Sequence, residues 1–165
     1  MIMMTIAQIM EKMIAFSEGN IHDITHLSCV WTYAKTIGEL EGLDAETRFI
    51  LEVAAITHDI ACPLCRKKYG NTNGSYQEQE GDPLVRAFLA DTGMTTAQID
   101  RVAYLVGHHH SPAQIDGIDY QILIEADYIV NASESGYSRQ TIQSFMEHTM
   151  KTAAGIRLTK TVFGV

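Results

Sequence analysis

Apolar residues recur every three or four positions along most of the chain, with polar residues between them, and this spacing is typical of amphipathic helices. The first such pattern runs from Ile2 to Ile14 and should end near Gly19. No stretch alternates between apolar and polar residues as a half-buried strand would, and the β-prone residues 161–163 are too few to change the class. The pattern therefore predicts an all-α domain.

Further helices are expected where a capping residue precedes a periodic segment. Asn20, Asp44 and Ser138 are suitable N-caps, and Thr95 and Gln98 have the spacing of a capping box. With the first pattern included, the sequence predicts a compact bundle of about seven helices, over approximately residues 2–19, 20–42, 44–57, 81–90, 95–107, 119–132 and 138–152.

Periodicity is lost between residues 61 and 79. The run from Gly70 to Ser75 has the composition of a loop, and a long loop in a compact domain is usually functional or mobile. The stretch begins with a C-x-x-C pattern, Cys62 to Cys65, but no second ligand pair stands at zinc-finger spacing. We therefore expect an ordinary loop here.

Composition restricts the class of protein. A chain of 165 residues, 46% hydrophobic and 19% charged, fits one folded domain over residues 1–165. Three cysteines are not a disulfide framework, and no apolar run approaches the roughly 18 residues of a membrane helix, so we expect a cytoplasmic protein without membrane contact. A net charge of −8 argues against a long nucleic acid as partner, although a bound cation could still recruit a nucleotide.

The most informative local feature is the doublet His58-Asp59, which ends an apolar helix. Burying an ionised Asp there is costly unless a cation or hydrogen-bond donors compensate it. Adjacent side chains on a helix diverge, but at a helix C-terminus the backbone turns away and both can approach one ion. The alternative is that the chain's histidines are satisfied interior side chains and its acidic residues are caps.

Three segments in order resemble the HD-domain superfamily of metal-dependent phosphohydrolases, over about residues 20–132. They are residues 23–30, 55–60 and 124–129. The resemblance implies that His26, His58, Asp59 and Asp127 bind a divalent metal ion. Imidazole and carboxylate ligands suit Mn, Fe, Co, Ni, Zn or Mg, and the sequence does not choose among them.

A second ion is a separate question. Relatives with a dinuclear site have two more histidines, and His109 matches the later one, whereas Glu80 stands at the earlier position. Glu80 is either an oxygen ligand or a carboxylate that is solvated or lies near a helix N-terminus. The resemblance thus implies one or two ions, with Asp59 as the bridging ligand if there are two. A histidine of the 108–110 run, above all His109 or His110, could relay a proton.

The basic cluster Arg66, Lys67 and Lys68 is either solvated loop charge or a clamp for the substrate phosphate. The family resemblance implies hydrolysis of a nucleotide or another small phosphate ester by a metal-activated water. Two alternatives remain: a non-catalytic sensor of metal or nucleotide, and a di-iron enzyme that activates oxygen. A homo-oligomer is compatible with the sequence.

Overall fold

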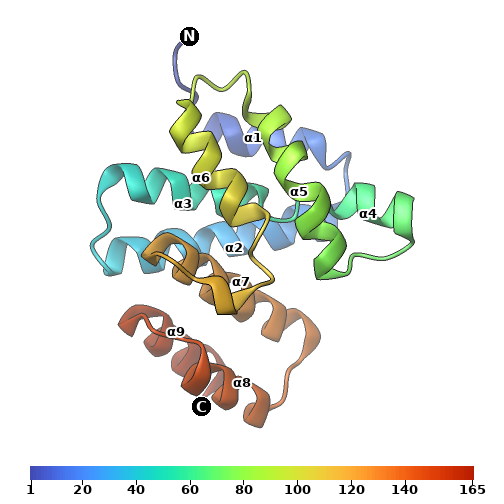
Figure 1. Ribbon diagram of the computed structural model, residues 1–165. Coiled ribbons are helices and arrows are strands. Elements are labelled where there is room, and N and C mark those ends of the chain that lie inside the picture. The colour runs from blue at the N-terminus through green and yellow to red at the C-terminus, as the bar shows by residue number, and fades with distance from the viewer.

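The computed structural model describes residues 1–165, and it is all-helical, as the sequence predicts. It has nine α-helices where about seven were expected, one short 3₁₀-helix and no strand (Figure 1). The α-helices are α1 (Ile6–Phe16), α2 (Ile21–Leu40), α3 (Ala45–Thr57), α4 (Cys62–Tyr69), α5 (Gly74–Leu89), α6 (Thr96–Val106), α7 (Ile118–Ser135), α8 (Arg139–His148) and α9 (Ala153–Phe163).

Side-chain caps fix several helix starts, because their oxygens satisfy backbone N–H groups that have no partner inside the helix. The expected caps Asn20, Asp44 and Ser138 each accept a backbone N–H of the following turn. Thr95 and Gln98 form the expected capping box. Thr5 forms another with Gln8, so α1 begins at Ile6 and not near Ile2.

The prediction of a loop is wrong for most of residues 61–79, because this region contains α4 and the first part of α5; residues 70–73, between the two helices, form the loop that the composition predicts. Pro63 occupies the first turn of α4, where its missing N–H costs nothing, and Gly70 ends the helix in a left-handed conformation. The first two buried residues of α5 are Gln77 and Gly81. Neither is an apolar side chain, so the sequence shows no apolar periodicity at the start of this helix. The β-prone residues 161–163 likewise belong to a helix, α9.

Helices α2, α3 and α7 pack against one another at the centre of the molecule, with α5 and α6 on one side and α8 and α9 on the other (Figure 1). Helix α7 is the most deeply placed, since twelve of its eighteen residues are buried. Side chains on α7 can therefore meet side chains from α2 and from the end of α3 inside the protein. No helix is both long enough and apolar enough to cross a bilayer.

The C-terminal helix is attached to α7 through Glu125, which is fully buried. One carboxylate oxygen of Glu125 accepts the backbone N–H groups of Lys151 (2.7 Å) and Thr152 (3.0 Å), and the other accepts the Thr152 hydroxyl. Gly155 leaves the space for this carboxylate, because a Cβ there would overlap Glu125 Oε2 and lie 2.6 Å from Thr152 Oγ1. The contact joins α9 to the helix that also carries Asp127.

Candidate metal centre

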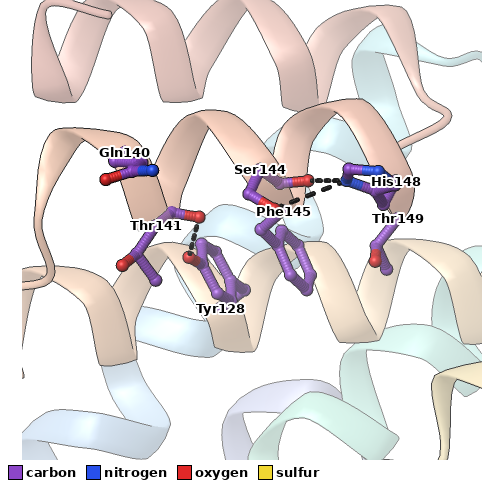
Figure 2. A pocket seen from close by; sticks show the side chains of 7 residues that line it. All are labelled: Tyr128, Gln140, Thr141, Ser144, Phe145, His148 and Thr149. Carbon is purple, nitrogen blue, oxygen red and sulfur yellow. Dashed lines mark hydrogen bonds between the residues drawn. The ribbon is translucent and has the colours of Figure 1, made fainter.

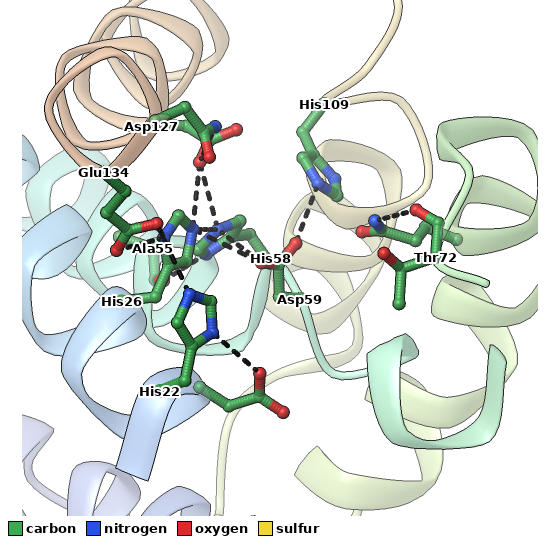
Figure 3. Close-up of polar contacts among 12 residues, drawn as sticks. His22, His26, Ala55, His58, Asp59, Thr72, His109, Asp127 and Glu134 are labelled. Atoms are coloured by element: carbon green, nitrogen blue, oxygen red, sulfur yellow. Dashed lines mark hydrogen bonds and ion pairs between the residues drawn. The ribbon is translucent and has the colours of Figure 1, made fainter. Parts of the chain in front are cut away.

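Four predicted ligands converge from three parts of the fold (Figure 3). His26 comes from α2, His58 and Asp59 from the end of α3, and Asp127 from α7. The two imidazole Nε2 atoms are 3.1 Å apart, and each lies 3.2–3.4 Å from Oδ1 of Asp127 and 3.3–3.4 Å from Oδ2 of Asp59. The expectation that the doublet can converge at a helix end is met, since His58 is the C-cap of α3 and Asp59 lies in the following turn.

Hydrogen bonds fix the orientation of these imidazoles. The Nδ1 atom of His58 lies 2.7 Å from the carbonyl oxygen of Ala55, and that of His26 lies 3.0 Å from the carboxylate of Glu134. Carbonyl and carboxylate oxygens accept hydrogen bonds, so each Nδ1 carries the proton and donates. In neutral rings, both Nε2 atoms then direct lone pairs toward the same point, as metal-binding histidines do.

His109 is oriented in the same way. It follows α6, its Nδ1 donates to the carbonyl oxygen of Val106 (2.8 Å), and its Nε2 lies 3.4 Å from Oδ1 of Asp59. This Nε2 is the one buried side-chain nitrogen or oxygen in the protein without a hydrogen-bond partner. A buried lone pair that faces a carboxylate is unfavourable unless a cation lies between them. The donor set therefore fits a divalent metal ion.

Asp59 belongs to two groups of potential ligands. His26, His58 and Asp59 form the first, and Asp59, His109 and His110 form the second. Oδ2 of Asp59 faces the first pair of histidines, whereas Oδ1 faces His109. The side chain thus has the geometry that a ligand shared between two ions requires.

The ionisation of these residues reflects their mutual charge. Burial alone would lower the pKa of His58, but the carboxylates of Asp59 and Asp127 raise it to about 9. Burial also opposes a charged His26, yet its hydrogen bond to Asp127 leaves the pKa raised. The pKa values of Asp59 and Asp127 fall well below the usual range, because the neighbouring histidines outweigh the effect of burial. The cluster consequently favours a positive charge among its carboxylates.

Glu80 is not brought into this cluster. Its carboxylate accepts from Lys68 Nζ and from the Tyr69 hydroxyl, both at 2.6 Å, and these contacts lower its pKa. Because α5 begins at Gly74, Glu80 lies within the helix and does not cap its N-terminus. In the structure, Glu80 is therefore neither beside the other candidate ligands nor at a helix N-terminus. Its carboxylate instead connects α4 to α5.

A polar cleft of about 170 Å³ opens beside the cluster. Among the three residues of the basic cluster, Arg66 lines it, and its guanidinium pairs with both oxygens of Asp23 at 2.6 and 2.8 Å. Lys68 is committed to Glu80, and Lys67 is exposed outside the cleft. His110 also lines the cleft, with Nε2 3.1 Å from Oε1 of Gln77.

Several polar residues near the cluster were not found from the sequence. Glu134 orients His26, and the amide of Asn131 donates to Oδ1 of Asp127 at 3.0 Å. The signal was present, since Asn131 and Glu134 follow Asp127 by four and seven positions and so share its face of α7. The other cleft residues, to which the sequence assigned no role in the site, are His22, Asp23, Cys62, Thr72 and Gln77.

The fold is thus a helical domain in which three buried imidazoles lie beside the carboxylates of Asp59 and Asp127, a donor set that could hold a metal ion. Comparison with protein families agrees with the motifs, since the HD domain family matches residues 23–138. The chain belongs to the HD domain family. A comparison with curated proteins and with solved structures gives no significant match.

Proposed function

We propose that this protein is a metal-dependent phosphohydrolase acting on a nucleotide or another small phosphate ester. The observation that carries the proposal is the convergence of His26, His58 and His109, each with Nε2 directed at Asp59, in a member of the HD domain family. The Nε2 atom of His109, which has no hydrogen-bond partner, gives the strongest support for a bound metal ion. A cation would compensate a buried lone pair that is otherwise unfavourable.

The first ion would be held by His26, His58, Asp59 and Asp127, and a second by Asp59 and His109. A divalent cation supplies Lewis-acid chemistry at such a site, acidifying a water molecule and neutralising charge on phosphoryl oxygens. Glu134 and the carbonyl oxygens of Ala55 and Val106 hold the three imidazoles in the tautomer that leaves Nε2 free.

The protein's own groups then serve the reaction by position. Hydrolysis forms a bond from the water oxygen to phosphorus, breaks the ester P–O bond, and requires a proton for the departing alcohol. His110 lines the cleft, where burial and the neighbouring His109 lower its pKa to about 4, so its imidazole is neutral near pH 7. A neutral imidazole there can accept a proton from the attacking water and pass it to the departing alcohol. Arg66 can shift from Asp23 to a phosphoryl oxygen, since both groups line the same cleft.

Charge and size favour a small substrate. The cleft is rich in carboxylates, from Asp23, Asp59, Asp127 and Glu134, so an anionic phosphate depends on bound cations to enter. The protein as a whole carries a charge of −8, which argues against the broad positive surface that a long nucleic acid requires. A single phosphate group on a small molecule therefore fits best.

The test combines metal analysis of protein purified without chelator with a panel of phosphate esters supplied with Mn, Mg, Co, Ni, Zn or Fe. We expect turnover of at least one small ester, lost in Asp59→Ala while the circular dichroism stays helical. His148→Ala, which changes an exposed histidine on α8, is the control and should remain active. Nucleotide binding without turnover would point to a sensor, and bound iron without phosphatase activity to an oxygen-activating enzyme; either result overturns the proposal.

A further inference from the structure

A second hollow, of about 180 Å³, adjoins the polar cleft. The two share His110, Asp127 and Asn131 as lining residues, so they meet at the candidate metal centre. Their combined volume lies at the lower end of the roughly 300–1,000 Å³ typical of small-molecule sites. A ligand whose reacting group lies in the polar cleft can therefore extend into the second hollow.

The lining of this second hollow is aromatic. Tyr128, Tyr137 and Phe145 contribute three rings to it, from α7, the turn after α7, and α8. The rings of Tyr128 and Phe145 are parallel with centroids 3.5 Å apart, and Tyr137 stands tilted 5.7 Å from Tyr128. Figure 2 shows the stacked pair from the side of a neighbouring pocket between α7 and α8. Tyr137 is 40% exposed, so part of its ring is free to contact a ligand.

The few charged residues that line the hollow also limit which ligand groups can bind there. Its lining contains no lysine or arginine, and its one carboxylate, Asp127, belongs to the metal cluster. Additional phosphates would find no partner there, whereas a flat uncharged ring would find aromatic faces and edges. We refer to Tyr128, Tyr137 and Phe145, with the hollow they line, as the aromatic subsite.

We propose that the aromatic subsite binds the part of the substrate that leaves with the ester oxygen, and that this part carries a flat, uncharged ring system. The inference rests on the proposed phosphohydrolase function and narrows its substrates to esters in which such a ring lies close to the phosphate. Tyr137 is then a specificity-determining residue, because its exposed ring can contact the leaving group without touching the phosphate.

The test compares benzyl phosphate with cyclohexylmethyl phosphate. Both release a primary alcohol with seven carbons, so they differ chiefly in whether the ring is flat. We expect kcat/KM to favour benzyl phosphate by about fivefold or more, the low end of what stacking on one aromatic side chain contributes. Tyr137→Ala should remove most of this preference through KM, and Tyr137→Phe should keep it. Phe16→Ala, which removes a partly exposed ring on α1, is the matched control and should also keep it.

A binding measurement separates this inference from the proposed function. Adenosine, which has a ring system but no phosphate, should shift the NMR resonances of Tyr128, Tyr137 and Phe145 in wild-type protein. If no ester is hydrolysed but these rings respond, the proposed function fails and the aromatic subsite stands. If esters are hydrolysed with no preference for the flat ring and adenosine moves none of the three rings, the aromatic subsite is overturned and the phosphohydrolase function stands.

Discussion

The Nε2 atoms of His26 and His58 lie 3.1 Å apart, although each ring donates from Nδ1 to an acceptor on the opposite side. Two neutral imidazoles arranged in this way present lone pairs to each other, which is repulsive unless a proton or a metal ion lies between them. The same two atoms are within 3.4 Å of oxygens of Asp59 and Asp127. The arrangement is thus one of competition between protons and a cation for a single position.

Removing one ligand should release the metal while the helices remain. We expect His58→Ala and Asp59→Ala each to bind less than a tenth of the wild-type metal after dialysis, because several ligands act on one ion. The measurement is elemental analysis, with circular dichroism for the fold. Normal metal content in Asp59→Ala would contradict the assignment of the centre.

Glu134 should matter for metal affinity although it is not a ligand. Its carboxylate fixes the tautomer of His26, and loss of such an outer partner typically weakens metal binding about 10- to 100-fold. We expect that decrease in Glu134→Ala, which removes the acceptor, measured as a Kd by calorimetry, together with a change in the ¹⁵N shifts of the His26 ring. Glu147→Ala, at an exposed position of α8, is the control and should change neither.

Glu80→Gln should leave the metal content unchanged. The carboxylate is engaged by Lys68 and Tyr69, so its loss should loosen the contact between α4 and α5 and lower the melting temperature slightly. Metal stoichiometry and melting temperature are measured on the same preparation. A drop in stoichiometry by one ion would show that Glu80 moves into the centre when metal binds.

The metal-free protein should lose stability as the pH rises from about 6.5 to 9. The pKa of His58 is about 9 in the folded protein, whereas an imidazole in an unfolded chain titrates near 6.5. A raised folded-state pKa contributes stability that is complete below the unfolded pKa and is lost as the pH passes the folded one. The free energy of unfolding is measured by urea denaturation in chelator at several pH values. His58→Gln removes the titrating imidazole, so its free energy of unfolding should depend less on pH. If the free energy of unfolding of the wild-type protein does not change over this pH range, the raised pKa of His58 is contradicted.

Gly155→Ala should destabilise the protein, although alanine favours helices by about 1 kcal/mol over glycine. The added methyl group would overlap the buried Glu125 carboxylate, and overpacking of this kind costs about 1–3 kcal/mol before any hydrogen bond is lost. We expect a net loss of about 1–3 kcal/mol in the free energy of unfolding. Thr161→Ala, on the exposed face of the same helix, should change it by less than about 0.5 kcal/mol.

The parts of the fold that the sequence predicts correctly are those that depend on interactions between neighbouring residues, such as helix starts. Capping by Asn20, Asp44, Thr95 and Ser138 depends on a few adjacent residues, and each cap occurs as expected. Helix α4 was missed because Cys62 and Cys65 are the only buried residues among its eight and three basic residues follow them, so it shows little amphipathic pattern. Its existence depends on packing against other helices, which a local pattern does not reveal.

The candidate site divides in the same way. The family pattern placed His26, His58, Asp59, Asp127 and His109, and the structure brings all five together. It did not anticipate that Lys68 and Tyr69 hold Glu80 in a different place, because that contact joins two helices of which one was not predicted. Tyr137 and Phe145 lay outside the matching motifs, and only the packing of α8 beside α7 places them near Asp127.

The attachment of α9 to Glu125 has a consequence for how the protein is made. During translation, His26 and the His58-Asp59 doublet are made well before Thr152 and Gly155. Thr152 donates hydrogen bonds to the buried Glu125 carboxylate of α7, and Gly155 leaves the space for it. Until then, the buried Glu125 carboxylate has the Gln121 amide of α7 as a partner but lacks the three donors from Lys151 and Thr152, so α7 is less stable with Asp127 in place. We therefore expect nascent chains to acquire tight metal binding only after α9 has been made.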